Sequence, residues 1–370
     1  MKNVIVIFGG ESPEHDISII TGVMALNAID RNLYTPIPIF VDKKGEWFTS
    51  TELFDLSFYK KIDYKKLIKV ALLPPSDNLF SIKNSKIKSF AKIYSAVNCM
   101  HGGEGEKGGV GAIFKQCKIP CASSGLFPSS LAMDKEFTKI ALQGIGVDFL
   151  PYVRIKRETF YLRREYALKF IGKKLGYPVI VKPANLGSSI GIEVATDEGQ
   201  IERGLERAFL FDEKVVVEKF LQGAKEINCA VYKKGGERVV SECEEPTTSK
   251  EFLTFEDKYQ TPSVKKFPAE IPEQLSSKIK EITSTVYKKF GFSGVVRMDY
   301  LIRENQIFLN EINSIPGSLS YYLFCKTPSD FSQMLTDLIE ESVDEYREYS
   351  RSVFTFKSDV LNLDSCKIKK

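Results

Sequence analysis

The sequence predicts an α/β protein with more than one domain. Its 370 residues indicate two or three domains, because one domain usually takes about 100 to 200 residues. The first third alternates short apolar runs with helical patterns, which is typical of an open α/β layer. The remainder places strand patterns around a glycine-rich turn and continues into a β-rich hairpin, so we expect further sheets with α+β elements.

Four segments define the first third. The apolar run of residues 4–8 predicts a strand, and a helix is expected over about 13–29. In "TPIPIFVDKKGEWFTS" the Lys-Lys-Gly predicts the turn of a hairpin. "YSAVNCM" predicts a buried strand that ends at His101.

The middle of the chain begins with helical patterns. We expect one helix over 129–146, then an extended segment, and then a long amphipathic helix that ends at Leu175. Strand patterns follow at residues 177–184, 191–195 and 215–221.

The last third is predicted to hold two hairpins and two helices. The first hairpin turns at Gly235 and Gly236, and the second pairs "GVVRMDYLIR" with "QIFLNEINSIPG". Helices are expected over about 272–290 and 328–349. The polar stretch 246–262 has no periodicity, and long segments of this kind often serve as lids.

Composition narrows the class of partner. The chain carries 52 basic and 48 acidic residues in a mixed order, so no field of one sign indicates nucleic acid or a membrane surface. No apolar run approaches the ~18 residues of a membrane span, and the run at 4–8 is too short for a signal peptide. The seven cysteines include no CxxC pair, which argues against disulfides or zinc. We expect a cytoplasmic protein that acts on a small molecule.

A glycine-rich turn follows the strand pattern "VIVKPA". Lys182 stands at the strand end, and Gly-Ser-Ser-x-Gly begins five residues later. Glycines let the backbone approach an oxyanion, and hydroxyl and N–H groups complete an anion site. The turn therefore predicts phosphate binding, although Gly-Ser turns are also common without a ligand. Lys135 and Lys258, taken singly, look like ordinary solvated lysines.

The second hairpin carries a candidate metal site. Arg297 and Asp299 are two residues apart, as are Glu311 and Asn313, so each pair projects from one face of its strand. Two carboxylates and an amide oxygen are ligands that Mg²⁺ prefers, with phosphates completing the shell. The alternative is a ladder of opposite charges across a surface hairpin. The apolar flanking residues favour the metal site.

The segment "VVVEKFLQGAKE" lies between these two motifs. Glu218 and the strand-end backbone can hydrogen-bond an adenine, and Glu226 can bind ribose hydroxyls. The segment follows the glycine-rich turn and precedes the hairpin, and this order supports its interpretation as part of a nucleotide site.

The turn "GGESPEHDIS" places a carboxylate where nucleotide enzymes usually hold phosphate. Ser12 as N-cap and Pro13 at N1 would put Glu14 in the first helical turn, where the dipole stabilises its charge. We expect Glu14 to bind the ammonium group of an amino acid.

Together these motifs resemble those of the D-alanine:D-alanine ligases of the ATP-grasp superfamily. The resemblance covers about residues 1–340 and rests on motifs in family order: "GGESPEHDIS", "HGGEGEKG", "MDKEFTK", "VKPANLGSSIG", "VEKFLQGAKE", "FEDKY", "RMDY" and "NEINSIPGS". It implies a three-domain ATP-grasp fold with a Rossmann-like N-terminal domain. The implied parts are a substrate-binding domain at 1–123, a central subdomain at 124–221, a C-terminal subdomain at 222–350 with the lid 246–262, and a tail at 351–370.

The resemblance implies a reaction in which ATP and one D-alanine form D-alanyl phosphate, which the amine of a second D-alanine then attacks. Two Mg²⁺ ions, with Mn²⁺ as an alternative, would be held by Asp299, Glu311 and Asn313. The nucleotide would contact Lys135, Lys182, Ser188, Ser189, Glu218, Lys219, Leu221, Glu226 and Lys258. The protein would be a homodimer formed through its N-terminal domain.

It also implies which residues bind substrates and act in catalysis. Arg297 would face the acyl phosphate and the tetrahedral intermediate, and Glu14 would take the ammonium of the first substrate. Ser188 and Tyr259 would link that site to the lid, where Lys258 contacts the transferred phosphoryl group. The remaining implied substrate or catalytic residues are His101, Gly317, Ser318, Ser320, Tyr322 and Leu323.

This chain departs from the family pattern at several positions. Lys107 and Gly111 replace an aspartate and a glutamine, and we expect Lys107 on the surface, with an effect on the first-substrate pocket as the alternative. Tyr322 stands where the family commonly has a serine for the carboxylate of the second substrate. A phenol still donates a hydrogen bond, and the Gly317 N–H or the hydroxyl of Ser318 or Ser320 can assist.

The sequence leaves one alternative function open and disfavours the others. A ligase that uses D-serine as second substrate has the same motifs, whereas the Lys258-Tyr259 pair disfavours D-lactate. A non-catalytic ATP-binding protein is disfavoured because the candidate metal ligands are intact. A nicotinamide dehydrogenase is disfavoured because "GGESPE" lacks the GxGxxG spacing.

Overall fold

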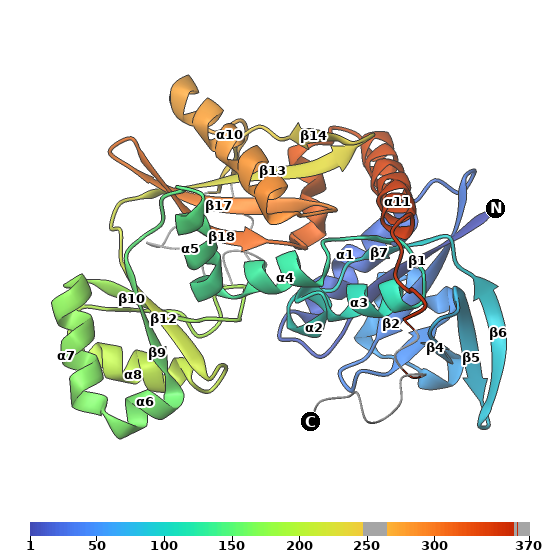
Figure 1. Cartoon of the computed structure of the whole chain (residues 1–370), viewed down its shortest axis with the longest axis horizontal. Coiled ribbons are helices and arrows are strands. Elements are labelled where there is room, and N and C mark those ends of the chain that lie inside the picture. The colour runs from blue at the N-terminus through green and yellow to red at the C-terminus, as the bar shows by residue number, and fades with distance from the viewer. Residues whose placement is uncertain (247–264, 359–360, 362–370) are drawn as a thin grey trace.

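The computed structural model describes residues 1–246, 265–358 and 361, and Figure 1 shows three sheets side by side. The N-terminal sheet has eight strands in the order β6-β5-β4-β3-β2-β1-β7-β8. Strands β2, β1, β7 and β8 are parallel, which confirms the predicted α/β layer. The bounds are β1 Lys2–Gly9, β2 Tyr34–Val41, β3 Trp47–Thr49, β4 Ile68–Leu72, β5 Asn78–Lys83, β6 Lys86–Lys92, β7 Ser95–Asn98 and β8 Cys121–Ala122.

Helix α1 (His15–Ala28) begins later than its predicted start at Pro13. Glu14 is the N-cap residue, so the expectation that Ser12 caps the helix was wrong. The reason is a separate turn before the helix, in which Ser12 Oγ accepts the Glu14 N–H at 3.0 Å and the Ser12 carbonyl accepts the His15 N–H at 3.1 Å. This turn holds Glu14 at the junction of β1 and α1. The other helices of this layer are α2 (Gly103–Glu106) and α3 (Gly109–Gln116).

The single helix predicted over 129–146 is two helices, α4 (Leu126–Met133) and α5 (Lys135–Gly144). Asp134 separates them in an extended conformation, and its carboxylate accepts the N–H groups of Glu136 and Phe137. An N-cap of this kind satisfies backbone donors that would otherwise have no partner. The break places Lys135 in the first turn of α5.

The central sheet is antiparallel, in the order β11-β10-β12-β9. All three predicted strands are present, but the long helix expected to end at Leu175 is interrupted at Arg163, whose φ of −141° and ψ of 47° are not helical. The helices pack apolar side chains on one face of the sheet. The bounds are β9 Tyr152–Lys156, β10 Val179–Pro183, β11 Glu193–Ala195, β12 Lys214–Lys219, α6 Arg157–Leu162, α7 Arg164–Leu175 and α8 Glu198–Ala208.

The C-terminal sheet has the order β14-β13-β17-β18, and both predicted hairpins are confirmed. Helix α10 (Glu273–Phe290) covers one face, where Ile279 and Val286 join the cluster of buried residues that includes Met298. A register shift between Asp299 and Tyr300 interrupts the second hairpin. The bounds are β13 Lys225–Lys234, β14 Glu237–Val240, β15 Glu245–Pro246, β16 Lys265–Lys266, β17 Val296–Arg303 and β18 Gln306–Asn313.

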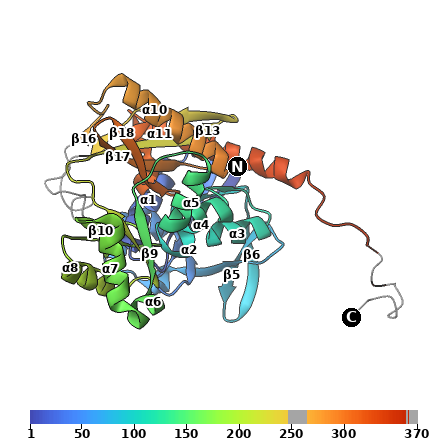
Figure 2. The ribbon, with the colours of Figure 1, turned by 60° about the vertical axis from the view of Figure 1, so that its left-hand side comes forward.

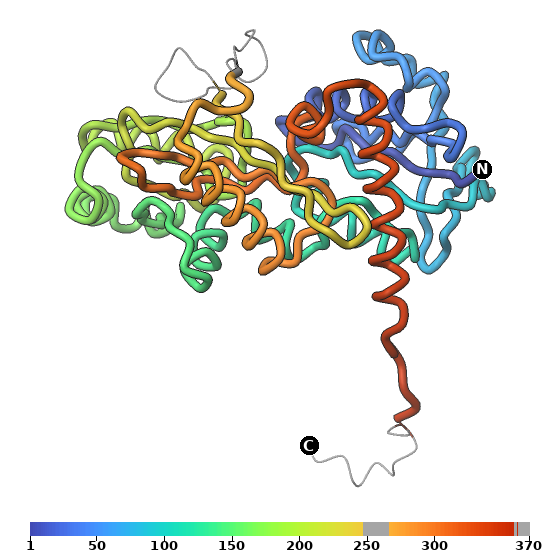
Figure 3. The backbone as a smooth tube through the Cα atoms, turned by 90° about the horizontal axis from the view of Figure 1, so that it is seen from above, coloured from blue at the N-terminus to red at the C-terminus, as the bar shows by residue number. Residues whose placement is uncertain are grey.

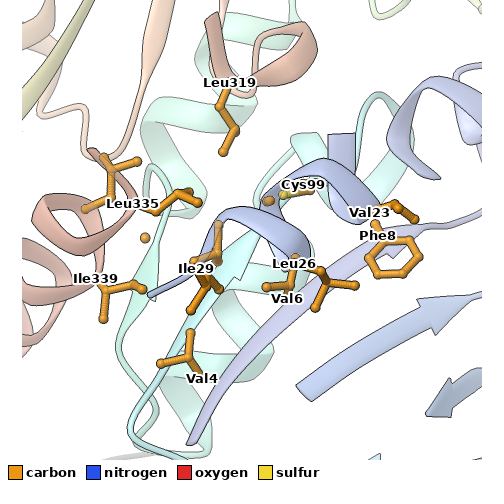
Figure 4. Packing of buried hydrophobic residues seen from close by; sticks show 14 of the residues in the cluster. Val4, Val6, Phe8, Val23, Leu26, Ile29, Cys99, Leu319, Leu335 and Ile339 are labelled. Carbon is orange, nitrogen blue, oxygen red and sulfur yellow. The ribbon is translucent and has the colours of Figure 1, made fainter. Parts of the chain in front are cut away.

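Helix α11 (Pro328–Ser350) confirms the predicted last helix and returns to the N-terminal layer. Leu335 and Ile339 of α11 belong to one buried cluster with Val4 of β1 and Leu26 of α1 (Figure 4). The short helix η4 (Gly317–Leu323) contributes Leu319 to the same cluster. This packing fixes the loop after β18 against α1. Figures 2 and 3 show residues 351–358, after α11, extending away from the body.

Two predictions about organisation remain predictions. Residues 247–262 of the expected lid lie outside the described residues. The domain limits at 123, 221 and 350 are not tested, although each large sheet lies within one of the three ranges. Within the described residues, no helix combines the length and apolarity needed to cross a membrane.

Candidate active site

A cavity of about 250 Å³ opens where the three sheets meet. Its wall combines Glu14, Thr21 and His101 from the N-terminal layer with Ser188 from the central part. The C-terminal part contributes Arg297, Glu311, Asn313, Gly317, Ser318 and Tyr322. Most of the predicted catalytic and substrate residues within the described part of the chain therefore lie around one cavity.

Glu14 is buried at the N-terminus of α1 and faces two glycines from other segments. A Cβ on Gly102 would lie 2.7 Å from Glu14 Oε2, and one on Gly187 would lie 3.0 Å from the same atom. Ser188 Oγ donates a hydrogen bond to Glu14 Oε1. These glycines leave room around the carboxylate, and Ser188 orients it.

His101 connects three segments by hydrogen bonds. Nδ1 lies 2.8 Å from the Ile315 carbonyl, and Nε2 lies 2.9 Å from Thr21 Oγ1. Ser318 N–H donates to the same Thr21 Oγ1 at 3.1 Å. Burial lowers the pKa of His101 to about 4, against the effect of the Ile315 carbonyl and together with the charge of Arg297. His101 is therefore neutral near pH 7 and positions the loop that carries Ser318.

The three predicted metal ligands lie on one face of the β17–β18 hairpin. Asp299 is opposite Glu311, and Asn313 is opposite Arg297. Arg297 binds Asp299 through Nε to Oδ1 (2.7 Å) and Nη2 to Oδ2 (2.9 Å). Lys135 Nζ lies 3.6 Å from Glu311 Oε1. Both carboxylates therefore already face a cation of the protein.

This set of donors fits a hard divalent cation. The Asp299 side chain is only 3% exposed and is paired with Arg297, so a metal ion would share this carboxylate with the guanidinium. Asn313 donates Nδ2 to Asp299 Oδ2 at 3.0 Å, which leaves its amide oxygen for another partner. Among the described residues, no three His, Cys, Asp or Glu side chains form a group able to hold a metal. The candidate set here has two carboxylates, and its third ligand is the amide of Asn313. The residues suit Mg²⁺ with phosphate oxygens rather than zinc.

A second cavity, of about 570 Å³, shares Glu226 and Pro246 with the first. Its wall includes the predicted nucleotide residues Lys182, Glu218, Lys219, Leu221 and Glu226, together with Asn310. Lys182 Nζ donates to Glu218 Oε2 at 2.7 Å and to Asn310 Oδ1 at 3.0 Å. A cavity of this volume, lined by apolar residues together with Lys182, Glu218 and Glu226, can take a base and a sugar.

The glycine-rich turn contributes Gly187 and Ser188 to the wall of the first cavity. Ser188 and Ser189 have left-handed φ angles of 52° and 58°, and turns of this kind can form anion sites from backbone N–H groups. Lys135 Nζ donates to the Leu186 carbonyl at 2.6 Å, so α5 and the turn are joined. This arrangement can bind phosphate oxygens with two lysines, Lys135 and Lys182.

The family description "D-ala D-ala ligase N-terminus" matches residues 3–124, and "D-ala D-ala ligase C-terminus" matches residues 141–344. The chain belongs to the D-Ala-D-Ala ligase family. It is 39% identical to a D-alanine--D-alanine ligase of Thermosipho melanesiensis, covering 98% of this chain and 99% of that one. It is 35% identical to a D-alanine--D-alanine ligase of Clostridium acetobutylicum, covering 92% and 97%.

Solved structures of D-Ala-D-Ala ligase relatives have the same architecture. The D-alanine-D-alanine ligase of Helicobacter pylori superposes with a TM-score of 0.76 at 29% identity, covering 92% of this chain and 98% of that one. The VanG D-Ala:D-Ser ligase of Enterococcus faecalis superposes with a TM-score of 0.77 at 30% identity, covering 92% and 99%. The predicted ATP-grasp fold is confirmed.

Helix η4 forms part of the cavity wall. It carries Tyr322, the position at which this chain departs from the sequence pattern of the D-Ala-D-Ala ligase family. Ser318, Leu319 and Ser320 have φ angles near 50°. Ser318 and Tyr322 line the cavity, and Arg297 Nη1 lies 3.5 Å from the Tyr322 hydroxyl. Ser320 and Leu323 are buried and do not line it. The expectation that all four residues face the substrate is therefore unsupported for Ser320 and Leu323.

Several other positions singled out from the sequence also lie away from this cavity of the ligase family member. Lys107 is half-buried and does not line the cavity, and Gly111 lies in α3 at another surface. His15 is buried, with Nδ1 2.7 Å from the Gly10 carbonyl, and does not line the cavity. Lys258 and Tyr259 lie outside the described residues.

Sequence reasoning missed several residues of the ligase site. Glu106 accepts the Gly102 N–H at 2.8 Å and lines the cavity. Burial and then the charge of Glu14 raise the pKa of Glu106 to about 8, against its bonds from the Gly102 and Ile315 N–H groups. Lys139, buried beside Glu218, was also missed, although its place four residues after Lys135 on a helix was a signal. Nothing in the sequence indicated that Thr21 belongs to the site.

Proposed function

We propose that the chain is an ATP-dependent ligase that joins two D-alanines into D-alanyl-D-alanine for peptidoglycan precursors. One observation carries the proposal: the cavity with Glu14 and Arg297 adjoins a nucleotide-sized cavity, and two of the candidate metal ligands, Glu311 and Asn313, lie in the wall of the first. An amino-acid site beside a phosphoryl-transfer site is what an acyl-phosphate route requires.

The residues divide the work by charge. ATP supplies the phosphoryl group that activates the first carboxylate, and Mg²⁺, held by Asp299, Glu311 and Asn313, supplies charge neutralisation for it. Glu14 accepts the ammonium of the first D-alanine and so directs its carboxylate toward the phosphates. Lys135 and Lys182 hold the phosphate oxygens. Arg297 faces the oxygen on which charge develops when the second amine attacks. The burial of these groups strengthens each interaction and keeps water from the acyl phosphate.

Phosphate release with Mg-ATP tests the proposal. Purified protein is incubated with D-alanine alone and then with D-serine or D-lactate added, and products are identified by mass spectrometry. We expect D-alanyl-D-alanine and one phosphate per dipeptide. Folded protein that binds Mg-ATP and gives no product with any D-alanine-containing pair would refute the ligase.

A D-alanine:D-serine ligase is the second candidate, and Tyr322 in the place of the usual serine is the observation that favours it. The likeness to the VanG D-Ala:D-Ser ligase shows the fold and leaves the second substrate open. Competition between D-alanine and D-serine in the same assay distinguishes the two by the mass of the product.

Tyr322→Phe is expected to raise KM for the second amino acid by about 10-fold with a small effect on first-site binding. The hydroxyl lines the cavity within reach of Arg297, and a hydrogen bond to a charged group contributes about 1.5 to 3 kcal/mol. The measurement is initial rate against D-alanine concentration, resolved into two sites. Tyr321→Phe is the control, because Tyr321 packs on Phe331 and does not line the cavity. Equal second-site KM values for Tyr322→Phe and wild type would remove Tyr322 from the site.

The domain limits, the location in the cell and the assembly are proposed together with the function. The domains are 1–123, 124–221 and 222–350, the protein acts in the cytoplasm, and the assembly is a homodimer formed by the N-terminal domain. Light scattering of the purified protein gives the mass of the assembly, and a monomer at assay concentration would exclude the dimer.

A further inference from the structure

Glu218 lies between two lysines in the wall of the 570 Å³ cavity. Lys182 Nζ is 2.7 Å from Glu218 Oε2, and Lys139 Nζ is 2.9 Å from Oε1. The Glu218 side chain is fully buried, and that of Lys139 is 2% exposed. One carboxylate therefore forms ion pairs with two lysines whose side chains are almost fully buried.

The two lysines differ in their surroundings. Lys182 lines the cavity and has Asn310 Oδ1 as a second acceptor at 3.0 Å. Lys139 does not line the cavity, and its ammonium lies 5.6 Å from the ring of Phe149 and 5.8 Å from that of Tyr152. Lys182 can thus exchange Glu218 for an anion in the cavity, whereas Lys139 stays behind Glu218.

The electrostatics support a permanent charge on Glu218. Burial by itself would raise the pKa of Glu218, but the charges of Lys139 and then Lys182 bring it down to about 2. Burial lowers the pKa of Lys139, and the Glu218 charge opposes that effect. If Lys182 turned to a phosphate, Lys139 would be the cation left to balance Glu218.

We infer that Lys139 is a positioning residue that keeps Glu218 ionised, so that the cavity accepts an adenine base and rejects guanine. The inference rests on the proposed function, because it takes the 570 Å³ cavity as the nucleotide site. An ionised carboxylate only accepts hydrogen bonds, which suits the 6-amino group of adenine and opposes the 6-oxo group of guanine. A protonated carboxyl group can donate to that oxygen and loses the discrimination.

Lys139→Met tests the inference through the preference for ATP over GTP. We expect kcat/KM for Mg-ATP relative to Mg-GTP to fall by at least about 10-fold, chiefly through KM. Without Lys139, Glu218 loses its charge, and the adenine amino group then loses its hydrogen bond to a charged acceptor. The preference of the variant should also fall as pH is lowered toward 6, whereas that of wild type stays flat. A purely structural role would lower both activities equally and leave the ratio unchanged.

Lys214→Met is the matched control. Lys214 is an ion-paired, mostly buried lysine on the same strand as Glu218, but it binds Asp134 and Glu136 and lines neither cavity. It should lose stability and keep the wild-type ATP to GTP ratio. If Lys139→Met does not fold, Glu218→Gln is expected to relax the same ratio, because an amide both donates and accepts.

The outcomes separate this inference from the proposed function. Dipeptide formation by wild type with an unchanged ATP to GTP ratio in Lys139→Met, or in Glu218→Gln, overturns the inference and leaves the ligase intact. Absence of ATP-dependent product from wild type overturns both.

Discussion

Arg297→Ala is expected to lower turnover by about 100- to 1,000-fold while Mg-ATP still binds, because loss of one preorganised donor to a developing oxyanion has an effect of this size. Arg297 lines the 250 Å³ cavity and is not among the residues that line the second cavity. The measurement is steady-state dipeptide formation together with calorimetric titration of ATP. Unchanged turnover would mean that the β17–β18 hairpin lies outside the reacting centre.

The same substitution should make stability depend on Mg²⁺. Arg297 neutralises Asp299, whose side chain is 3% exposed, and removing one partner of a buried ion pair costs about 3 to 5 kcal/mol. We expect the melting temperature of Arg297→Ala to fall without Mg²⁺ and to recover more than that of wild type when Mg²⁺ is added. Arg238→Ala, which removes an exposed arginine of β14, is the control and should show neither change. Equal recovery in both variants would contradict the metal assignment of Asp299.

Glu14→Gln is expected to raise KM for the first D-alanine by about 100-fold or more and to leave ATP binding nearly unchanged. The carboxylate is buried, and an ammonium paired with it loses a charge-assisted hydrogen bond when the charge is removed. Isothermal titration of each ligand separates the two effects. The isosteric amide keeps the volume, so Gly102 and Gly187 stay in place.

Glu11→Gln is the matched control for that experiment. Glu11 is exposed in the same turn and does not line the cavity, so its charge should have little effect on either ligand. A larger loss of ATP affinity than of D-alanine affinity in Glu14→Gln would refute the assignment of Glu14 and return the first turn to the nucleotide.

Local patterns explain why much of the fold was predictable. Side chains alternate faces along a strand, so the spacing of Arg297 and Asp299, and of Glu311 and Asn313, was enough to predict a shared face. The two helix breaks were not predictable in this way, because the apolar period continues through Asp134 and Arg163. A helix of the right period can be divided by a single residue that leaves the helical conformation, as Asp134 does where its side chain caps α5.

Contacts between distant segments explain most of what was missed. The partners Glu14 and Ser188 are 174 residues apart, and His101 and Ile315 are 214 apart. No spacing rule relates such positions. The family motifs indicated that Glu14, Ser188 and His101 share a site, but not that His101 uses both ring nitrogens on Thr21 and Ile315.

The sequence by itself determined the fold class, the two C-terminal hairpins and the residue types of the candidate site, because periodicity, turn residues and charged motifs are local properties. Only the tertiary structure decided which charges are buried together. Lys139 is one lysine among many in the sequence, and it becomes a partner of Glu218 only because the fold brings this side of α5 to the end of β12. Likewise Tyr322 reaches Arg297 only because η4 is held against α1. Burial changes the strength of a charge, and burial is set by packing between segments that are far apart in the chain.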